Sequence, residues 1–348
     1  MRTHLLYSKN LERLVLPLET SIVIYDARLV GAVPGFRRWI KKCPYAFPVR
    51  AGEKLKSLSS FEKTANQIHR RVGEHVTRSW TVVAIGGGSV GDFAGFFASV
   101  YRRGLRLVQI PTTWLAAIDS SHGGKTALNL RGVKNQIGTF YPASETHLVQ
   151  SVLNALSKEH AEDAVGEFAK IALIDGRAWT LRLRRPTKRS AKAMSEWLWK
   201  LLPSAIESKM RVVRRDPSET SGVRQLLNLG HTFGHVLEAD RGLSHGRSVA
   251  LGLLFAVDAS ESLGSLTRDQ ARGARAWLSQ MGIERDPTGR DRVARAKAAK
   301  LLRSDKKRDA GDFVWFLAVR GGRTTQIERR LVAVSQLLEV AQVYGWLR

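Results

Sequence analysis

The sequence has almost no cysteine and no long apolar segment. Cys43 is the only cysteine among 348 residues, so no disulfide can form within the chain and a reducing compartment is expected. The one compact apolar run near the start, residues 21–25, is too short for the hydrophobic part of a signal peptide. No stretch reaches the length of a membrane span. We therefore expect a cytoplasmic protein that does not enter a membrane.

Acidic residues are scarce compared with basic ones. The chain has 31 Asp and Glu against 56 Lys and Arg, which gives a formal net charge of +25. Such a charge attracts nucleic acid, anionic lipid or phosphorylated metabolites and does not distinguish among them. Much of the excess lies at 177–215 and 268–308, where scattered basic residues on helices usually form a solvated face. Because the chain has no recognised DNA- or RNA-binding motif, we do not expect nucleic acid as its partner, and the charge alone does not identify the partner.

The length and the apolar pattern predict two domains. A chain of 348 residues exceeds the size at which single cores usually stop growing. The runs at 21–25, 81–85 and 105–110 are typical of buried strands, and apolar helical segments between them favour a parallel sheet. Beyond residue 150 the pattern becomes amphipathic helices, with a hairpin at 313–328 turning at Gly321-Gly322 and a closing helix near 333–344. We predict an α/β domain over residues 1–150 and a mostly helical domain over 151–348.

A glycine-rich turn follows the strand at 81–85. Gly86, Gly88 and Gly91 have the spacing at which bare backbone N–H groups and a helix N-terminus can hold a pyrophosphate. The usual acidic partner for the ribose is missing, because the next strand ends in Ile-Pro-Thr at 110–112. Asp26, which ends the strand at 21–25, is a candidate for that contact.

A second glycine-rich loop, GGKT at 123–126, resembles part of a P-loop. The position of the first P-loop glycine holds Asp119, so we reject that interpretation. We expect Lys125, Lys134 and Asn135 to lie in loops, where they offer the charges and amide donors that a phosphorylated acyclic substrate requires. The alternative is that these lysines are ordinary surface residues.

Histidines near residue 230 indicate a metal site. His231 and His235 lie four residues apart, on one face of a helix, and Glu238 follows one turn later. His245 offers a third imidazole, and Glu167, at the start of an otherwise apolar helix, offers a carboxylate. The alternatives are that the histidines line a buried helix without metal, and that Glu167 only interacts with a helix dipole.

The motifs together resemble those of the 3-dehydroquinate synthase family. The matching segments occur in the family's order over roughly residues 20–320: GGGSVGDFAGFFASVYRRG, QIPTTWLAAIDSSHGGKTALN, KNQIGTFY, GEFAK, SETSGVRQLLNLGHTFGHVLEA, HG and SDKK. The resemblance implies an NAD-dependent homodimer that requires Zn²⁺ or Co²⁺. It also implies a Rossmann-like N-terminal domain followed by a helical domain that binds metal and substrate.

The resemblance assigns roles to individual residues. It implies a metal site made by Glu167, His231 and His245, and it places His235 at the substrate phosphate, whereas spacing alone pairs His231 with His235. The residues that would bind NAD are Asp26, Glu53, Lys56, Gly87, Gly88, Asp92, Thr112 and Thr113, with Lys134 between cofactor and substrate. The residues that would surround the substrate are Asp119, Lys125, Asn135, Lys170, Lys209, Arg224, Asn228, His235 and Lys306. Arg103 would reach the phosphate site of the second subunit.

The implied reaction converts 3-deoxy-arabino-heptulosonate 7-phosphate into 3-dehydroquinate and phosphate. A secondary hydroxyl is transiently oxidised by NAD, phosphate is eliminated, the ketone is reduced again, and an intramolecular aldol step closes the ring. Arg224 would bind the substrate carboxylate with two parallel hydrogen bonds. One alternative is a related cyclase acting on a heptulose phosphate without a carboxylate. Another is an inactive relative whose basic surface binds nucleic acid or an acidic partner.

The chain departs from the family pattern in three segments. The family has an acidic residue two positions after the third metal ligand, where this chain has Arg247. Ile171 and Ala172 replace the family's Tyr-Gly after Lys170, and the usual Asp near Leu148 is absent. We expect these changes to affect metal affinity and catalytic efficiency without removing a proposed ligand.

Overall fold

The computed structural model describes residues 3–176, 183–188, 190–304, 312–320 and 326–348. The chain divides into two compact units. The first contains residues 1–161 and 190–202, and the second contains residues 162–189 and 203–348. Helix α8, Ala191–Arg215, belongs to both units, and the division falls at Pro203 inside it.

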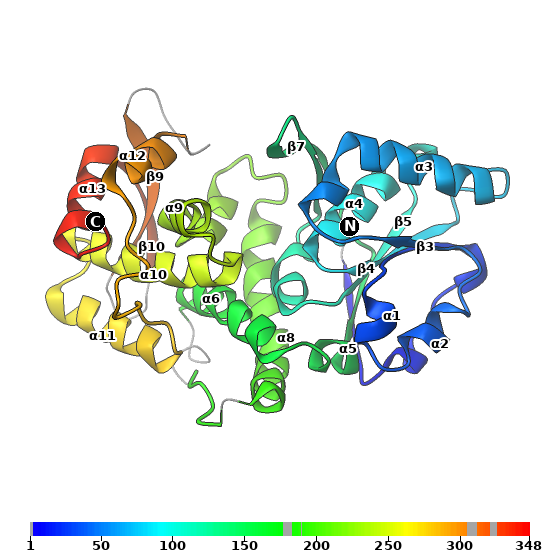
Figure 1. Cartoon of the computed structure of the whole chain (residues 1–348), viewed down its shortest axis with the longest axis horizontal. Coiled ribbons are helices and arrows are strands. Elements are labelled where there is room, and N and C mark those ends of the chain that lie inside the picture. The colour runs from blue at the N-terminus through cyan, green and yellow to red at the C-terminus, as the bar shows by residue number, and fades with distance from the viewer. Residues whose placement is uncertain (1–2, 177–182, 189, 305–311, 321–325) are drawn as a thin grey trace. The chain divides into compact units, whose positions relative to one another are not determined.

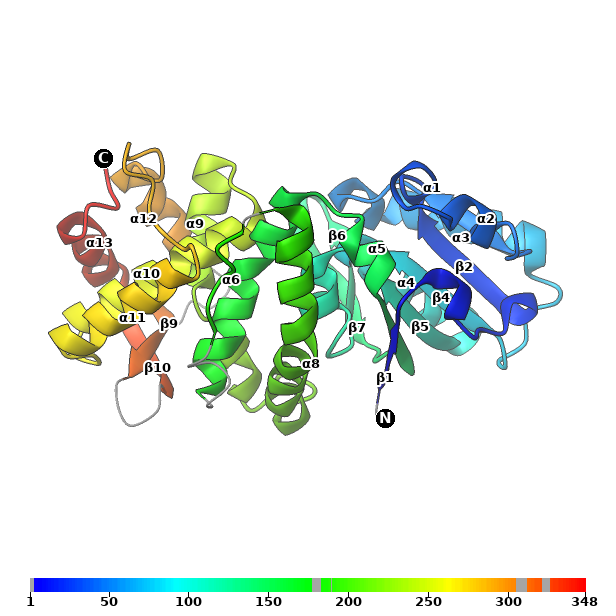
Figure 2. The same cartoon turned by 90° about the horizontal axis from the view of Figure 1, so that it is seen from below.

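The first unit is built on a six-stranded parallel sheet (Figures 1 and 2). The strands, in their order across the sheet, are β1 His4–Ser8, β8 Glu145–Val149, β5 Arg106–Pro111, β4 Thr81–Gly86, β2 Ser21–Asp26 and β3 Ala46–Val49. The predicted strands at 21–25, 81–85 and 105–110 are β2, β4 and β5, three of the four inner strands. The predicted α/β class with a parallel sheet is confirmed.

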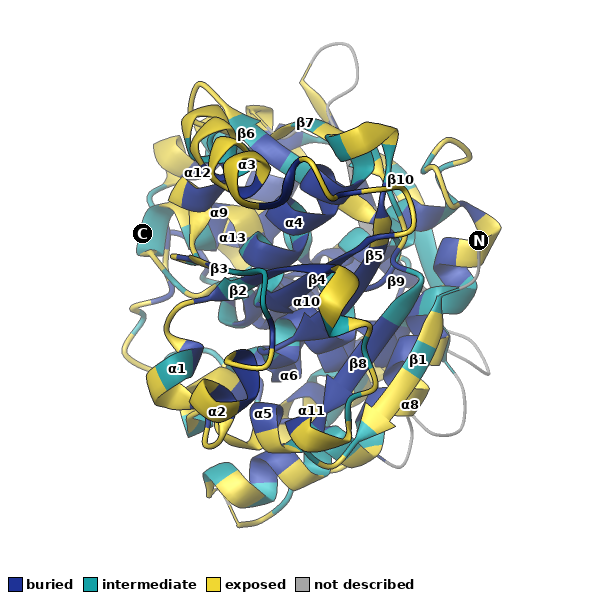
Figure 3. Ribbon diagram, turned by 90° about the vertical axis from the view of Figure 1, so that its right-hand side faces the viewer, coloured by how far each residue is buried: buried dark blue, intermediate teal, exposed yellow. Residues whose placement is uncertain are grey.

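Helices cover both faces of this sheet. Because side chains alternate along a strand, Ile22 and Ile24 point to one face while Val23 points to the other. The first face packs against α3 Leu58–Val72 and α4 Gly88–Val100, and the second against α1 Leu29–Ala32, α2 Phe36–Ile40 and α5 Gln150–Asn154. Figure 3 shows the inner strands buried, while the edge strand β1 is largely exposed. Burial on both faces explains why the inner strands appear in the sequence as continuous apolar runs.

The loop predicted after β5 contains regular structure. A π-helix, η5 Ala116–Ser120, is followed by the antiparallel pair β6 Lys125–Leu130 and β7 Val133–Phe140. This pair includes Lys125, Lys134 and Asn135, which we had expected in loops. That expectation was wrong because cross-strand pairing, which local sequence does not reveal, forms the hairpin.

The second unit is helical, as predicted. Its helices are α6 Lys158–Asp175, which begins just before the unit boundary, the remainder of α8, α9 His231–Arg241, α10 His245–Ser262, α11 Arg268–Gln280, α12 Arg295–Arg303 and α13 Val334–Val343. The hairpin is also present, as β9 Phe313–Arg320 paired with β10 Gln326–Ala333, and its second strand ends later than expected. The predicted turn at Gly321-Gly322 lies outside the described residues. None of the described helices is both long enough and apolar enough to cross a membrane.

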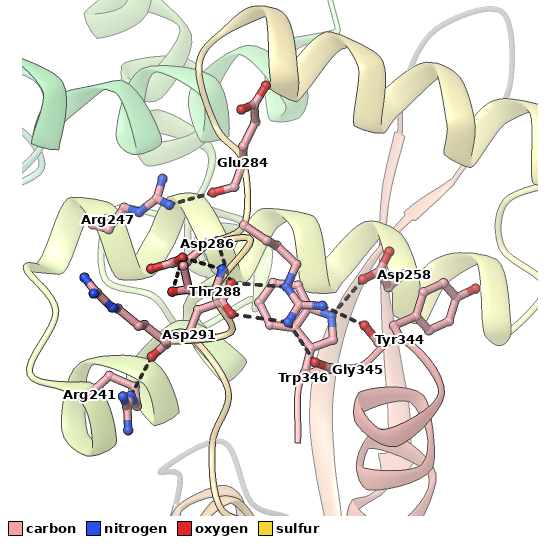
Figure 4. A network of polar contacts seen from close by, with 12 residues as sticks. Arg241, Arg247, Asp258, Glu284, Asp286, Thr288, Asp291, Tyr344, Gly345 and Trp346 are labelled. Carbon is pink, nitrogen blue, oxygen red and sulfur yellow. Dashed lines mark hydrogen bonds and ion pairs between the residues drawn. The ribbon is translucent and has the colours of Figure 1, made fainter. Parts of the chain in front are cut away.

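Helix α10 forms the centre of the second unit. It is buried from Ser248 to Ser260, and its Phe255 stacks on Phe233 of α9 with ring centroids 3.9 Å apart. At its far end, Asp258 Oδ2 accepts a hydrogen bond of 2.8 Å from Trp346 Nε1 (Figure 4). This helix begins with His245, so the core of the unit supports a predicted metal ligand.

Candidate metal centre and surrounding polar groups

Three helices of the second unit bring Glu167, His231 and His245 together. Glu167 lies in the middle of α6, whereas His231 and His245 are the first residues of α9 and α10. One potential ligand atom from each residue lies within 4.8 Å of the other two. Glu167 Oε1 is 3.8 Å from His231 Nε2 and 3.6 Å from His245 Nε2. A carboxylate and two imidazoles at this spacing form a donor set suited to Zn²⁺ or Co²⁺.

Hydrogen bonds orient both imidazoles toward Glu167. His231 Nδ1 lies 3.3 Å from the carbonyl oxygen of Leu229, and His245 Nδ1 lies 3.1 Å from Glu238 Oε2. An acceptor at Nδ1 favours a proton on that nitrogen and leaves Nε2 as the metal-binding atom. The two rings therefore fit a divalent cation between them and Glu167.

The electrostatics of this cluster also favour a cation. Hydrogen bonds with Glu167 and Glu238 raise the pKa of His245 to about 10, although burial opposes the charge. In the metal-free protein a proton on His245 thus provides positive charge between two carboxylates. A bound metal ion would replace that proton.

Lys170 determines which oxygen of Glu167 faces the histidines. It lies one turn further along α6, and its Nζ pairs with Glu167 Oε2. Both side chains are almost completely buried, so each charge depends on the other for stabilisation. This pairing leaves Oε1 directed toward the imidazoles.

His235 lies outside the metal-type cluster. Its ring is edge-on to that of His231, with centroids 5.4 Å apart, and the residue is exposed. Spacing alone had paired these two histidines as metal ligands. The structure instead groups His231 with Glu167 and His245, because the three helices meet at the N-termini of α9 and α10.

A buried carboxylate holds the loop that carries Arg224. Asp216 accepts hydrogen bonds from the backbone N–H groups of Thr220 at 2.8 Å, Ser221 at 3.2 Å and Arg224 at 3.0 Å. Burial disfavours its charge, but these bonds outweigh that effect and lower the pKa of Asp216 to about 2. The Arg224 guanidinium is itself buried and donates to the carbonyl of Pro217 at 2.7 Å. Two other predicted substrate residues, Lys209 and Asn228, belong to this unit, on α8 and at the end of the turn η6 Val223–Asn228.

Predicted cofactor and substrate residues of the first unit form a connected cluster. Lys56 Nζ lies 2.6 Å from Asp92 Oδ2 and also donates to Asn135 Oδ1. Burial raises the pKa of Asp92, and Lys56 counteracts this. Asn129, which sequence reasoning missed, donates to Glu53 Oε2 at 2.8 Å and accepts from the Asn135 backbone N–H at 2.9 Å.

The glycine-rich turn lies at the carboxyl ends of β4 and β5. Gly87 and Gly88 connect β4 to α4, and a Cβ on Gly87 would lie 3.2 Å from Thr113 Cγ2. Thr112 N–H donates to the Gly86 carbonyl at 3.0 Å and so joins the two loops. This arrangement suits a pyrophosphate at a helix N-terminus.

The remaining predicted residues of the first unit are more dispersed. Asp26 ends β2 as expected, but its carboxylate accepts two-pronged hydrogen bonds from Arg28 at 2.8 and 3.1 Å. Asp119 lies in η5, which follows β5 in the chain. Arg103, Lys125 and Lys134 are exposed. Lys306 lies outside the described residues.

Arg247 is directed at the segment that follows α11. Its Nη2 donates to the Glu284 carbonyl at 2.6 Å, as Figure 4 shows. Burial lowers the pKa of Arg247, while Asp291, Asp286 and other nearby carboxylates oppose this effect. The positive charge is therefore balanced by the acidic groups of the 284–291 segment.

Solved structures show which class of protein has this fold. The chain superposes on 2-deoxy-scyllo-inosose synthase complexed with carbaglucose-6-phosphate, NAD+ and Co2+ with a TM-score of 0.81, at 23% identity, covering 97% of this chain and 95% of that one. The 2-epi-5-epi-valiolone synthase of Streptomyces hygroscopicus, solved with NAD+ and Zn2+, gives 0.78 at 19% identity, covering 99% and 97%. The chain therefore belongs to the fold class of these two synthases.

Sequence comparisons identify the family within this class. Residues 46–163 match the 3-dehydroquinate synthase N-terminal model and residues 164–308 match the C-terminal one. The chain is 35% identical to the 3-dehydroquinate synthase of Pyrobaculum islandicum, covering 88% of this chain and 86% of that protein. It is 37% identical to that of Rhodospirillum rubrum, covering 79% and 72%. The chain belongs to the 3-dehydroquinate synthase family.

Proposed function

We propose that this chain is an NAD- and metal-dependent lyase that converts 3-deoxy-arabino-heptulosonate 7-phosphate into 3-dehydroquinate and phosphate. This reaction belongs to the shikimate pathway of aromatic amino acid biosynthesis. The observation that supports it most directly is the cluster of Glu167, His231 and His245 in a member of this family. The relatives' names and the NAD+ and metal bound to neighbouring structures agree with this assignment.

The proposed metal ligands are Glu167 Oε1 and the Nε2 atoms of His231 and His245. Bound Zn²⁺ or Co²⁺ would supply Lewis acidity at the substrate hydroxyl, and bound NAD would accept and return a hydride. Lys170 pairs with the second oxygen of Glu167 and leaves Oε1 directed toward the imidazoles. Glu238 keeps the His245 ring oriented through Nδ1.

Arg224 is the proposed anchor for the substrate carboxylate. Its planar guanidinium can donate two parallel hydrogen bonds to a carboxylate, which a hydroxyl group cannot match. Asp216 holds the backbone of Arg224 in place before any substrate binds. This preorganised arginine favours a heptulosonate phosphate over a heptulose phosphate, which has no carboxylate.

We propose that the two halves of the chain bind different ligands. Residues 1–150 would bind NAD, through the glycine-rich turn and the Lys56–Asp92 cluster. Residues 151–348 would bind the metal and most of the substrate, with His235 at the phosphate. We further propose a cytoplasmic homodimer in which Arg103 completes the phosphate site of its partner.

The test is phosphate release by the purified protein, supplied with the heptulosonate phosphate, NAD and Zn²⁺ or Co²⁺. Turnover to 3-dehydroquinate that a chelator abolishes is the expected result. Turnover only with a heptulose phosphate would reassign the substrate. If the protein binds neither NAD nor metal, the result would contradict the assignment as an enzyme and favour an inactive relative.

Two variants separate the proposed roles. His231→Ala should abolish Co²⁺ binding and turnover, whereas His160→Ala, which alters an exposed histidine of α6, should leave both unchanged. Arg224→Ala should mainly raise KM, because the substrate carboxylate loses its partner. Full metal content in His231→Ala would refute the ligand assignment.

A further inference from the structure

Asp163 connects the helix that carries Glu167 to the helix that begins with His245. It lies four residues before Glu167 on α6, and so on the same side of that helix. Its Oδ1 accepts a hydrogen bond from the Ser244 hydroxyl and another, of 2.9 Å, from the Arg247 backbone N–H. Ser244 and Arg247 flank His245 at the start of α10. One carboxylate therefore binds the chain on both sides of a proposed metal ligand.

Asp163 caps α10 from a neighbouring helix. The residue that precedes α10, Ser244, accepts from Arg247 N–H at a longer distance of 3.4 Å. Asp163 is closer to the same N–H group and carries a negative charge at the positive end of the helix dipole. The first turn of α10 thus depends on α6 for its best hydrogen-bond acceptor.

The two helices also touch through their backbones. A Cβ added to Gly246 would lie 1.7 Å from the Asp163 carbonyl oxygen, and one added to Gly166 would lie 2.3 Å from the Gly246 carbonyl oxygen. Each glycine adjoins a proposed ligand, because Gly166 precedes Glu167 and Gly246 follows His245. Backbone contact sets how closely the helices approach, and the Asp163 side chain sets how the first turn of α10 is oriented against α6.

We propose that Asp163 is a positioning residue for the metal site, which fixes the separation of Glu167 Oε1 and His245 Nε2, 3.6 Å in this structure. This inference rests on the proposed function, because it assumes that these two residues bind the metal. Asp163 and Glu167 share one rigid helix. Displacement of α10 from Asp163 therefore moves His245 away from Glu167. Metal sites tolerate errors of only about 0.2 Å in ligand distance, so a small displacement weakens binding.

The decisive experiment measures Co²⁺ binding to Asp163 variants by competition with a chelator and by the visible absorption of the bound ion. Asp163→Ala should weaken Co²⁺ binding by about ten- to a hundredfold, as expected for loss of a group that orients a ligand, and should change the absorption spectrum. Asp163→Asn keeps an oxygen acceptor at the same position and should recover most of the affinity. Glu162→Gln is the matched control, because the adjacent Glu162 carboxylate pairs with Arg185.

Asp163→Glu distinguishes positioning from simple helix capping. It keeps the charge and the capping oxygens but adds a methylene between α6 and α10. The proposal predicts weaker Co²⁺ binding and an altered spectrum for Asp163→Glu. If Asp163→Ala does not fold, Asp163→Glu alone tests the proposal. Wild-type affinity and spectrum in folded Asp163→Glu and Asp163→Ala would overturn the proposal and leave Asp163 as a cap only. Failure of the unsubstituted protein to bind Co²⁺ would instead refute the proposed function.

Discussion

Replacing Gly246 by alanine should damage the metal site more than it damages the fold. The new Cβ would lie 1.7 Å from the Asp163 carbonyl oxygen and 2.6 Å from its carbon, both of which are backbone atoms that cannot rotate away. Real contacts of this kind keep at least 3.0 Å, so α6 and α10 must separate by about 1.3 Å. Overpacking of this size typically costs about 1–3 kcal/mol of unfolding free energy. The same shift is several times the roughly 0.2 Å tolerance of a metal–ligand distance.

The assay compares the unfolding midpoint and the Co²⁺ dissociation constant of Gly246→Ala with those of a matched glycine variant. Gly273 lies in helix α11 with no atom within 4 Å of an added Cβ. Gly273→Ala should keep Co²⁺ affinity and stabilise the protein by up to about 1 kcal/mol, because alanine favours a helix. Gly246→Ala should lower the midpoint and weaken Co²⁺ binding at least tenfold. Unchanged Co²⁺ affinity in Gly246→Ala would refute the argument that this crossing sets the site geometry.

Three further predictions concern charged groups. Lys56→Met should lower the unfolding free energy by about 3 kcal/mol, because it leaves the Asp92 carboxyl buried without its cation. A denaturant titration that shows a loss of less than about 1 kcal/mol would contradict this prediction. Asp216, whose pKa is lowered to about 2, should add stability above its ordinary pKa near 4, and this stability should be lost as the pH falls toward 2. Asp216→Asn should remove this part of the acid dependence. The same dependence of melting temperature on pH in both proteins would contradict the prediction. His245, whose pKa is raised to about 10, should stabilise the metal-free protein fully below its ordinary pKa near 6.5 and lose that effect as the pH rises through 10. Co²⁺ should therefore release about one proton near pH 8, and calorimetry in buffers of different ionisation enthalpy that detects none would refute this.

The sequence predicted three of the four inner strands of the sheet but neither the inner strand β8 nor the edge strands β1 and β3. Strands β2, β4 and β5 are buried on both faces, so their apolar runs are visible in the sequence. Strand β1 is mostly exposed, and its sequence, HLLYS, has no clear period. The pair β6 and β7 contains many polar residues, and its sequence predicts a loop. Strands of this kind are stabilised by their partners, and partners are not visible in local sequence.

By itself, the sequence determined the class of the fold, the residue types of the metal site and the family, because apolar periodicity and ordered motifs are properties of the linear chain. Only the tertiary structure decided which groups meet. It separated His235 from the cluster and turned Arg247 toward Glu284. It also revealed Asp163 and Asp216. These two carboxylates bind backbone N–H groups, and every residue except proline has such a group. Which N–H groups are available depends on where helices end and loops turn in three dimensions, so no residue pattern could have identified them.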